Sequence, residues 1–569
     1  MESSQKSIMD NKLLMAGICI LVGIIMYYVI PAPYELRHST FAANAALSTQ
    51  LGGIATEAEA AADEAAEAHA VAQAALSAAP GDAAVAAAAT AAFENYTALR
   101  AEATAARADA AAAAGRVVAP ANRHGWRLFA IFMATIVALI VQPLPMISVA
   151  LISIAVVAAT GTRTIGQALG GFQDATIWLI VGAFFISRGF IKTGLGSRIA
   201  YMFMMTFGKK SLTLAYSLTA ANLVMGPAMP SNTARCGGVL APIARSLANL
   251  YDSKVEDGTE RRLGSFLAFT TFQADIVVCA MFMTAMAANP MAVDLAYNAI
   301  GLEITWAGWF VAAVVPGMLN LILIPLVIYK LYPPEIKDTP AATQLAKDRL
   351  KDMGPLTKDE KWMMFVFVLL LFLWVTGGNF NAWFGIPNIA ATTTAFIGIS
   401  VLLCAGVLTG DDIKSEKTAW DTLVWFSALV MMAGQLNTLG VIGWFSGTVA
   451  NAVAHMDWVM AFLIIALAYF YSHYFFASAT AHVAAMYVAM LTAAVAIGTP
   501  PMFAGLVLAF FSNIFMGITH YGTGNAPPWF GMGYVKLGTW WGYAFILSVM
   551  NIVIWVGVGG LWWRVIGLW

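Results

Sequence analysis

Long apolar runs separated by short polar segments constrain the fold of this chain more than any other feature. Of its 569 residues, 60% are hydrophobic and 11% are charged, a composition typical of proteins that cross a membrane many times. Since a spanning helix needs about 20 apolar residues, the runs predict an all-α membrane protein with about 11 transmembrane helices and two re-entrant hairpins. The formal net charge is −1, so no basic field indicates a nucleic-acid partner.

The amino-terminal part is predicted to contain a first transmembrane helix in residues 1–30 and an insert in residues 31–125. We expect the first helix to be retained, because no small-residue cleavage site stands before Pro31. The insert is rich in alanine, the best helix former, and Pro80-Gly81 marks a turn. It predicts an extracytoplasmic helical hairpin. The alternative is a solvated, partly disordered spacer, because the insert has little apolar surface to bury.

The remaining chain forms two halves that repeat each other, 126–332 and 362–569, joined by a charged cytoplasmic linker at 333–361. Each half contains five apolar spans and one hairpin, at 211–250 and 458–497. Because five is odd, the second half must enter the membrane with the opposite orientation. This arrangement is typical of transporters built from inverted repeats.

A helix break follows the hairpin in each half, at Ala288-Asn289-Pro290 and at Gly522-Thr523-Gly524-Asn525-Ala526-Pro527-Pro528. Pro and Gly interrupt the hydrogen-bond ladder of a helix, and corresponding interruptions in two repeats point to a transporter binding site. With the amino terminus placed in the cytoplasm, 20 of the 30 Lys and Arg residues lie on the cytoplasmic side, as the positive-inside rule requires. The first hairpin then opens from the cytoplasm and the second from outside.

The tip of each hairpin is polar, and its residues are the candidate substrate ligands. These are Ser231, Asn232 and Thr233 in the first tip, and Ser478, Ala479 and Thr480 in the second. Helix N-termini and hydroxyl or amide donors bind carboxylates, so two facing tips suit a molecule with a carboxylate at each end. The alternative is simple helix capping, which Ser, Asn and Thr also favour.

Two basic residues occupy equivalent positions behind the tips. Arg235 lies two residues after Thr233, and His482 lies two residues after Thr480. Charge inside a membrane is costly and usually functional, so both are interpreted as cations that compensate a bound dianion. The alternatives are a structural ion pair between Arg235 and Asp275 and a neutral core imidazole at His482.

These residues carry a family resemblance. From about residue 126 to the end, and in the first helix, the chain resembles the divalent anion:sodium symporter (DASS, solute carrier 13) family. Within it, the chain is most similar to bacterial citrate/succinate-type and plastid 2-oxoglutarate/malate-type antiporters. The segments that carry the resemblance are Pro230–Thr233, Ser478–Thr480, Ala287–Pro290 and Gly522–Pro528.

The resemblance implies a homodimer in a bacterial inner membrane, a scaffold, and a transport domain that moves as an elevator. It also implies that the tips contact substrate, and we place Asn289, Thr523 and Gly524 of the breaks in the same site. Sodium-coupled members carry Ser-Asn-Thr at both tips, and the asparagines help to form sodium sites. Ala479 departs from that pattern, so Arg235 and His482 are interpreted as built-in cations.

The predicted function is therefore sodium-independent exchange of di- or tricarboxylates, with no cofactor. An empty carrier with two buried, unpaired cations would be costly to move, which favours exchange over net transport. The alternative within the family is a sodium-coupled dicarboxylate symporter, which would bind Na⁺. A channel is disfavoured because two re-entrant tips predict a closed site. An enzyme is not expected, because no His-Glu-x-x-His or Gly-x-Ser-x-Gly pattern or Asp dyad occurs in the spans.

Overall fold

The computed structural model describes residues 17, 19–24, 41–79, 82–116, 123–141, 143–442, 444, 448 and 456–569. The regular secondary structure in this part of the chain consists of helices, with no β-strand, which confirms the predicted all-α class. It contains eight helices long and apolar enough to cross a membrane, together with three shorter apolar helices. Most of the predicted first helix and the Pro80-Gly81 turn lie outside the described residues.

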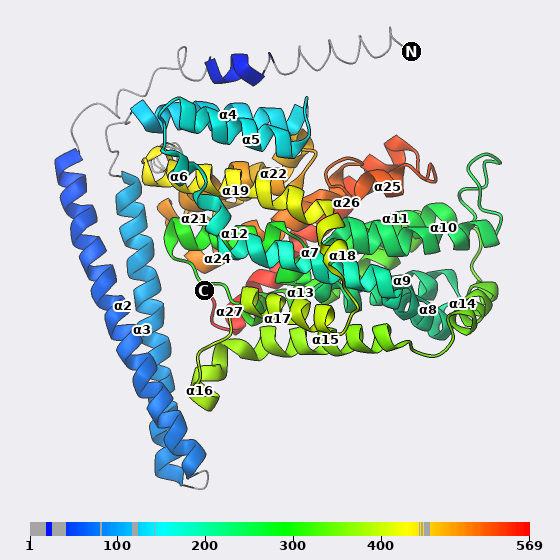
Figure 1. Ribbon diagram of the computed structural model, residues 1–569, viewed down its shortest axis with the longest axis horizontal. Coiled ribbons are helices and arrows are strands. Elements are labelled where there is room, and N and C mark those ends of the chain that lie inside the picture. Colours follow the sequence, from blue (N-terminus) through cyan, green and yellow to red (C-terminus); the bar gives the residue numbers. More distant parts are fainter. Residues whose placement is uncertain are drawn as a thin grey trace.

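The Ala-rich insert contains two long helices, α2 (Phe41–Ala78) and α3 (Ala83–Arg116), that pack along each other. Figure 1 shows both helices running across one end of the bundle formed by the rest of the chain. α3 contacts α12 and α23, and α2 contacts α16. Arg100 Nη2 lies 2.6 Å from Glu303 Oε2, so an ion pair joins the insert to the loop after α12.

The first half begins with helices that cross the bundle and continues into the first hairpin. Asp174 caps α7 by accepting hydrogen bonds from the backbone N–H groups of Thr176 and Ile177, and Gly194, with a φ of 75°, ends it. The elements in this half are α4 (Arg123–Val141), α5 (Met146–Ala159), α6 (Ile165–Ala168), η3 (Gly170–Gln173), α7 (Ala175–Thr193), α8 (Leu195–Phe207), α9 (Ser211–Met225), η4 (Gly226–Ala228), η5 (Thr233–Leu240), α10 (Ala241–Leu250), α11 (Gly264–Met281), η6 (Met283–Ala285), α12 (Ala288–Ile300) and α13 (Trp306–Leu331).

The linker and the second half contain the remaining elements of the described chain. Thr357 and Glu360 form a capping box at the start of α15, and Glu360 also pairs with Arg198 of α8 at 2.6 Å. The elements are α14 (Pro340–Met353), α15 (Lys358–Thr376), η7 (Gly377–Asn379), α16 (Phe380–Phe384), α17 (Ala391–Cys404), α18 (Gly410–Ser415), α19 (Lys417–Thr438), α21 (Trp458–Tyr471), η8 (Ser472–Phe475), α22 (Ala479–His482), η9 (Val483–Tyr487), α23 (Val488–Ala496), α24 (Pro501–Ile514), η10 (Phe515–Ile518), α25 (Ala526–Phe530), α26 (Leu537–Ile552), η11 (Val553–Gly559) and α27 (Gly560–Val565).

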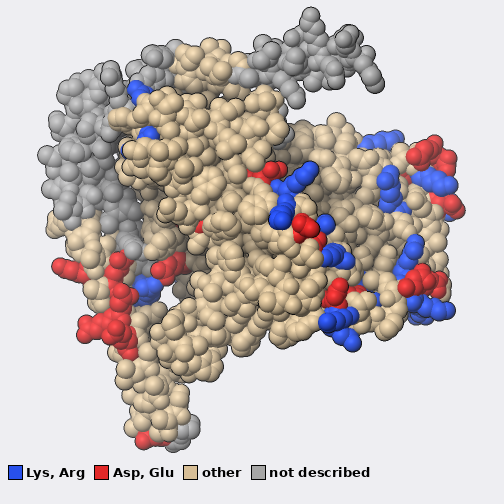
Figure 2. Space-filling view, in the orientation of Figure 1, with Lys and Arg blue, Asp and Glu red and all other residues tan. Residues whose placement is uncertain are grey.

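The helices of the bundle pack in two groups. The frame group consists of α4, α5, α7, α15, α17 and α19, which contact one another. The hairpin group consists of α9–α13 and α21–α27, and its centre is α11, every residue of which is buried. On the face in Figure 2, Lys and Arg gather toward the end that carries α8, α10 and α14, whereas Asp and Glu predominate on the insert at the other end.

Candidate functional site

The first polar tip lies between η4 and η5. Ser231 Oγ accepts a hydrogen bond from the backbone N–H of Ala234 at 3.1 Å, so this hydroxyl caps the second limb. Asn232 is buried, and its Nδ2 donates to Thr523 Oγ1 at 3.1 Å. Thr233 is exposed. The capping alternative therefore holds for Ser231, while Thr233 keeps an accessible hydroxyl beside the helix N-terminus.

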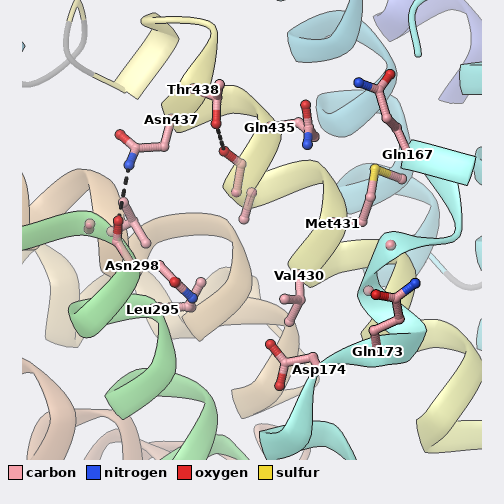
Figure 3. A pocket seen from close by; sticks show the side chains of 16 residues that line it. Gln167, Gln173, Asp174, Leu295, Asn298, Val430, Met431, Gln435, Asn437 and Thr438 are labelled. Atoms are coloured by element: carbon pink, nitrogen blue, oxygen red, sulfur yellow. Dashed lines mark hydrogen bonds between the residues drawn. The ribbon is translucent and has the colours of Figure 1, made fainter. Parts of the chain in front are cut away.

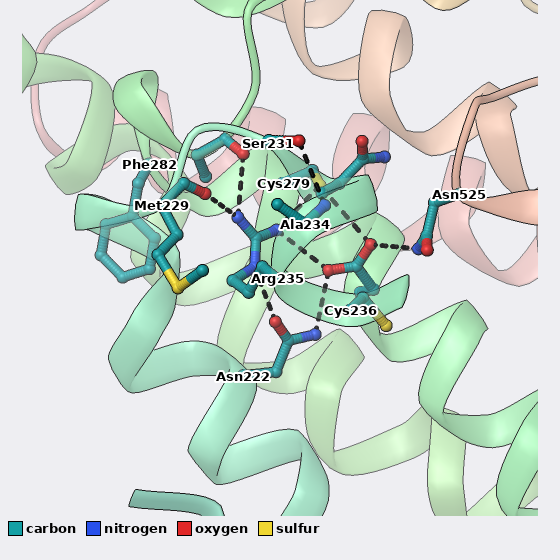
Figure 4. A network of polar contacts seen from close by, with 12 residues as sticks. Asn222, Met229, Ser231, Ala234, Arg235, Cys236, Cys279, Phe282 and Asn525 are labelled. Atoms are coloured by element: carbon teal, nitrogen blue, oxygen red, sulfur yellow. Dashed lines mark hydrogen bonds and ion pairs between the residues drawn. The ribbon is translucent and has the colours of Figure 1, made fainter. Parts of the chain in front are cut away.

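Behind this tip, the guanidinium of Arg235 is completely buried and paired (Figure 4). Its Nη2 lies 2.9 Å from Asp275 Oδ1, and its Nε donates to Asn222 Oδ1 at 2.7 Å. Its Nη1 donates to the backbone carbonyls of Met229 and Ala285. The arginine thus joins the first tip to α9, to α11 and to the segment between α11 and α12.

The carboxylate of Asp275 is shared among the same elements. It accepts a hydrogen bond from Asn222 Nδ2 at 3.0 Å and one from Asn525 Nδ2 at 2.8 Å. An unpaired buried charge costs several kcal/mol, and this carboxylate supplies the required countercharge. The interpretation of Arg235 as an unpaired compensating cation is therefore corrected: Arg235 and Asp275 form the structural ion pair that was the alternative.

The first helix break lies several residues before its predicted position. α11 ends at Met281 and α12 begins at Ala288, so Asn289 and Pro290 stand in the first turn of α12, where proline is tolerated. Asn289 is completely buried. Its Nδ2 donates to the carbonyls of Cys279 and Phe282, and its Oδ1 accepts from Asn513 Nδ2 at 2.7 Å. The polar atoms of Asn289 therefore hold the break together, and its contact with substrate stays a prediction.

The second polar tip repeats the pattern of the first. Ser478 Oγ accepts a hydrogen bond from the backbone N–H of Ala481 at 3.3 Å and lies 3.1 Å from Thr480 Oγ1. Ala479 is buried, whereas Ser478 and Thr480 are half-buried. As in the first tip, the serine caps the second limb and the threonine hydroxyl is left beside the helix N-terminus.

His482 is buried behind the second tip and packs among aromatic rings. Its ring stacks on Phe476 and Phe515 at centroid distances of 4.3 and 4.6 Å. Its Nδ1 lies 3.1 Å from Nδ1 of His473, a buried residue that the sequence analysis did not single out. The signal that could have found it is the polar pair Ser472-His473 within the apolar first limb of the hairpin.

The second break, between η10 and α25, contacts both hairpins. Gly522 contributes a carbonyl that accepts a hydrogen bond from His473 Nε2 at 2.8 Å, and a Cβ at this position would lie 2.7 Å from that nitrogen. Thr523 contacts Asn232 of the first tip, and Gly524 lies beside Thr233 Oγ1. Thr233 and Gly524 are both exposed. The second break thus contacts the first tip directly and the second hairpin through His473, which precedes the second tip.

This arrangement is suited to binding an anion. Two helix N-termini begin at the tips, where backbone N–H groups and the helix dipole favour negative charge. The hydroxyl groups of Thr233 and Thr480 add donors, and the nearby carboxylate of Asp275 is already paired. Among the residues that the structure describes, no group of three or more His, Cys, Asp or Glu could hold a metal ion.

A separate cavity of about 520 Å³ is lined by none of the predicted site residues. Figure 3 shows Asp174 at the start of α7, Asn298 of α12, and Gln435 and Asn437 of α19 around it. Asn437 Nδ2 donates to the carbonyl of Asn298 at 3.4 Å. The cavity therefore lies between the frame group and α12 of the hairpin group, which also contact each other through Asn437 and through a side-chain hydrogen bond between Asp294 of α12 and Asp174.

Comparison with known proteins assigns the family. The sodium:sulfate symporter transmembrane region matches residues 118–569. YflS of Bacillus subtilis (strain 168), named as a proposed malate transporter, is 55% identical over 78% of this chain and 91% of its own length. The chloroplastic dicarboxylate transporter 1 of Spinacia oleracea is 50% identical, over 79% of this chain and 78% of its own. The L-tartrate/succinate antiporter of Escherichia coli (strain K12) is 32% identical over 79% of this chain and 95% of its own length. The chain is thus a transporter and belongs to the divalent anion:sodium symporter family.

Proposed function

We propose that this protein exchanges dicarboxylates or tricarboxylates across the membrane without sodium. The names of its relatives specify malate, dicarboxylates, tartrate and succinate, all of which carry carboxylates at both ends. A helix N-terminus at each of the two polar tips would present donors to both ends of such a molecule. A substrate without ionised groups would gain nothing from this arrangement.

The contacts of Arg235 are the observation that supports sodium-independent exchange. In transporters with broken helices, backbone carbonyls at the helix ends coordinate sodium. Here Nη1 of Arg235 donates to two such carbonyls, those of Met229 before the first tip and Ala285 in the first break. The guanidinium therefore fills the position that a sodium ion would need. Ala479 in the second tip offers no side-chain oxygen for a second ion.

The cost of moving the substrate-free carrier across the membrane favours exchange over net transport. When no substrate is bound, the two helix N-termini leave positive partial charge and unpaired N–H groups at the tips. Moving these groups through a low-dielectric environment is costly. A dicarboxylate pairs with them, and no sodium ion is available to replace it. The loaded carrier is therefore the form that crosses.

We place the amino terminus in the cytoplasm of a bacterial cell and the insert outside, since this topology satisfies the positive-inside rule. We also propose a homodimer whose hairpin group moves as an elevator against the frame group. Support for this motion comes from the polar cavity of about 520 Å³ between α12 and α19, because a permanently packed interface would have no such gap.

Counterflow in proteoliposomes tests the proposal. We expect uptake of labelled succinate to require unlabelled dicarboxylate inside and to be unchanged when K⁺ replaces Na⁺. Thr480→Ala should weaken uptake about tenfold because it removes one donor to a charged group. Thr492→Ala is the matched control, since its hydroxyl bonds only to backbone carbonyls of its own helix. Sodium-driven uptake into vesicles without internal dicarboxylate would establish the symporter alternative.

A further inference from the structure

Two histidines form a continuous hydrogen-bonded chain behind the second tip. Nδ1 of His473 lies 3.1 Å from Nδ1 of His482. At the far ends, His473 Nε2 contacts the carbonyl of Gly522 at 2.8 Å and His482 Nε2 contacts Ser472 Oγ at 3.0 Å. Both imidazoles are completely buried. Their protons are therefore placed by these neighbours and not by water.

The neighbours determine the tautomers of the neutral pair. A carbonyl oxygen can only accept, so Nε2 of His473 carries a hydrogen and its Nδ1 is an acceptor. Nδ1 of His482 must then donate to it, which leaves Nε2 of His482 without a hydrogen. The hydroxyl of Ser472 donates to that nitrogen. Every polar atom of the neutral chain is satisfied.

The same chain has room for one additional proton. It binds at Nε2 of His482, and Ser472 then accepts from that nitrogen while donating its own hydrogen to the carbonyl of Tyr469, 2.9 Å away. A second proton is excluded, because both Nδ1 atoms would carry hydrogens that face each other at 3.1 Å. The pair therefore alternates between neutral and singly positive without losing a hydrogen bond.

Among the residues that the structure describes, no ion pair reaches the two histidines. Around the pair pack α21, η9, η10, α24, α12, α4 and the segment before α25. Among the described residues on these elements, the titratable side chains facing the pair are Tyr469, at a centroid distance of 4.8 Å from His482, and beyond it Tyr487. The ion pairs found in the described chain include neither histidine.

We infer that His473 and His482 together form a one-proton binding site that controls how tightly the second tip holds a carboxylate. This inference rests on the proposed function. His482 follows Thr480 within one helical turn, so a positive charge there stabilises a carboxylate bound at the tip through a low dielectric. By reciprocity, the bound carboxylate increases the affinity of the pair for its proton. His473 is a positioning residue that supplies the acceptor for His482 Nδ1–H.

The pH dependence of succinate exchange tests this site. We expect the apparent KM of the wild type to rise with pH by up to about tenfold per pH unit, the limit for one coupled proton. The variant His482→Gln lacks the proton site, so any pH dependence of its apparent KM reflects the titration of succinate itself. His473→Phe keeps a ring beside Phe515 but removes the acceptor, so its profile should follow His482→Gln. His473→Gln retains one donor and one acceptor and should follow the wild type.

His520→Gln is the matched control, since His520 is near the same break but hydrogen-bonds to Trp541 and not to the pair.

A second measurement uses purified protein in weakly buffered solution at neutral pH. Succinate should cause uptake of up to one proton by the wild type and none by His482→Gln. An exchanging wild type with a pH-independent KM and no proton uptake would overturn this site alone. A His473→Gln variant as impaired as His473→Phe would also overturn it. A wild type that does not exchange would instead refute the proposed function.

Discussion

At the scale of single residues, the pairing of Arg235 with Asp275 changes what a substitution at either position will do. Both side chains are completely buried, and a buried pair is strongly destabilised when only one partner is removed. The arginine also satisfies the carbonyls of Met229 and Ala285. Its contribution to stability and the sodium exclusion that we propose for it therefore depend on the same contacts.

We predict that Arg235→Ala lowers the free energy of unfolding by about 3–5 kcal/mol, because it leaves the carboxylate of Asp275 buried and unpaired. The double variant Arg235→Gln with Asp275→Asn should recover at least half of this loss. Thermal unfolding in detergent measures both. The matched control is Lys414→Ala, since the pair of Lys414 with Asp411 is exposed and contributes little. Unfolding of Arg235→Ala at the wild-type temperature would contradict the prediction.

The residues of the tips could be predicted from the sequence, whereas the partners behind them could not. Ser231, Thr233, Ser478 and Thr480 stand out because polar residues interrupt apolar runs at matched positions. His473 does not stand out, since its role depends on a contact with Gly522, 49 residues away. Such contacts between segments distant in sequence arise from tertiary packing, which the local pattern does not encode.

At the scale of elements, the second limb of each hairpin contains a π-helical stretch, which follows α22 in the second hairpin. η5 (Thr233–Leu240) and η9 (Val483–Tyr487) are both π-helical, a rare conformation that is frequent at functional sites. The apolar runs predict the limbs themselves. They do not predict the π-helical conformation, because π-helix and α-helix require the same apolar pattern. The position of the first break was mispredicted for a related reason: Pro290 is compatible with the first turn of α12 and not only with a break.

The end of α7 is held to α18 by a charged contact that should depend on pH. Lys192 Nζ lies 2.6 Å from Asp412 Oδ2. This hydrogen bond, together with those from Thr409, lowers the pKa of Asp412 to about 2. Because the folded-state pKa is below the ordinary value of about 4, the stabilisation is fully present above pH 4. It is lost as the pH falls from about 4 to 2.

We therefore predict that Asp412→Asn is less stable than the wild type at neutral pH, by no more than about 2 kcal/mol because Lys192 is partly exposed. The difference should vanish toward pH 2. Thermal unfolding at a series of pH values measures it, with Asp411→Asn on the exposed neighbouring residue as control. A difference that persists unchanged at pH 2 would show that Asp412 stabilises α18 by other means.

At the scale of the whole molecule, the two groups of helices differ in how they could move. The hairpin group is joined internally by the buried chain Arg235–Asp275–Asn525 and by Asn289 with Asn513, so it should move as one body. Its contact with the frame group near the insert includes a polar cavity, the hydrogen bond from Asn437 to Asn298 and one between Asp294 and Asp174. The sequence predicts the repeats, but this interface depends on how they pack.

An elevator requires α12 to slide past α19, whereas a mechanism in which only the tips open does not. Cysteines at Asn298 and Asn437, in a Cys404→Ser background that removes the one exposed native thiol, should allow a short bifunctional reagent to join the two groups. We predict that cross-linking stops succinate counterflow and that reductant restores it. Cysteines at Ala175 and Thr392 provide the control, because that contact of 2.8 Å lies within the frame group and its cross-link should leave exchange unchanged. Full exchange by the cross-linked Asn298–Asn437 pair would refute the elevator, since the two helices could then no longer move apart.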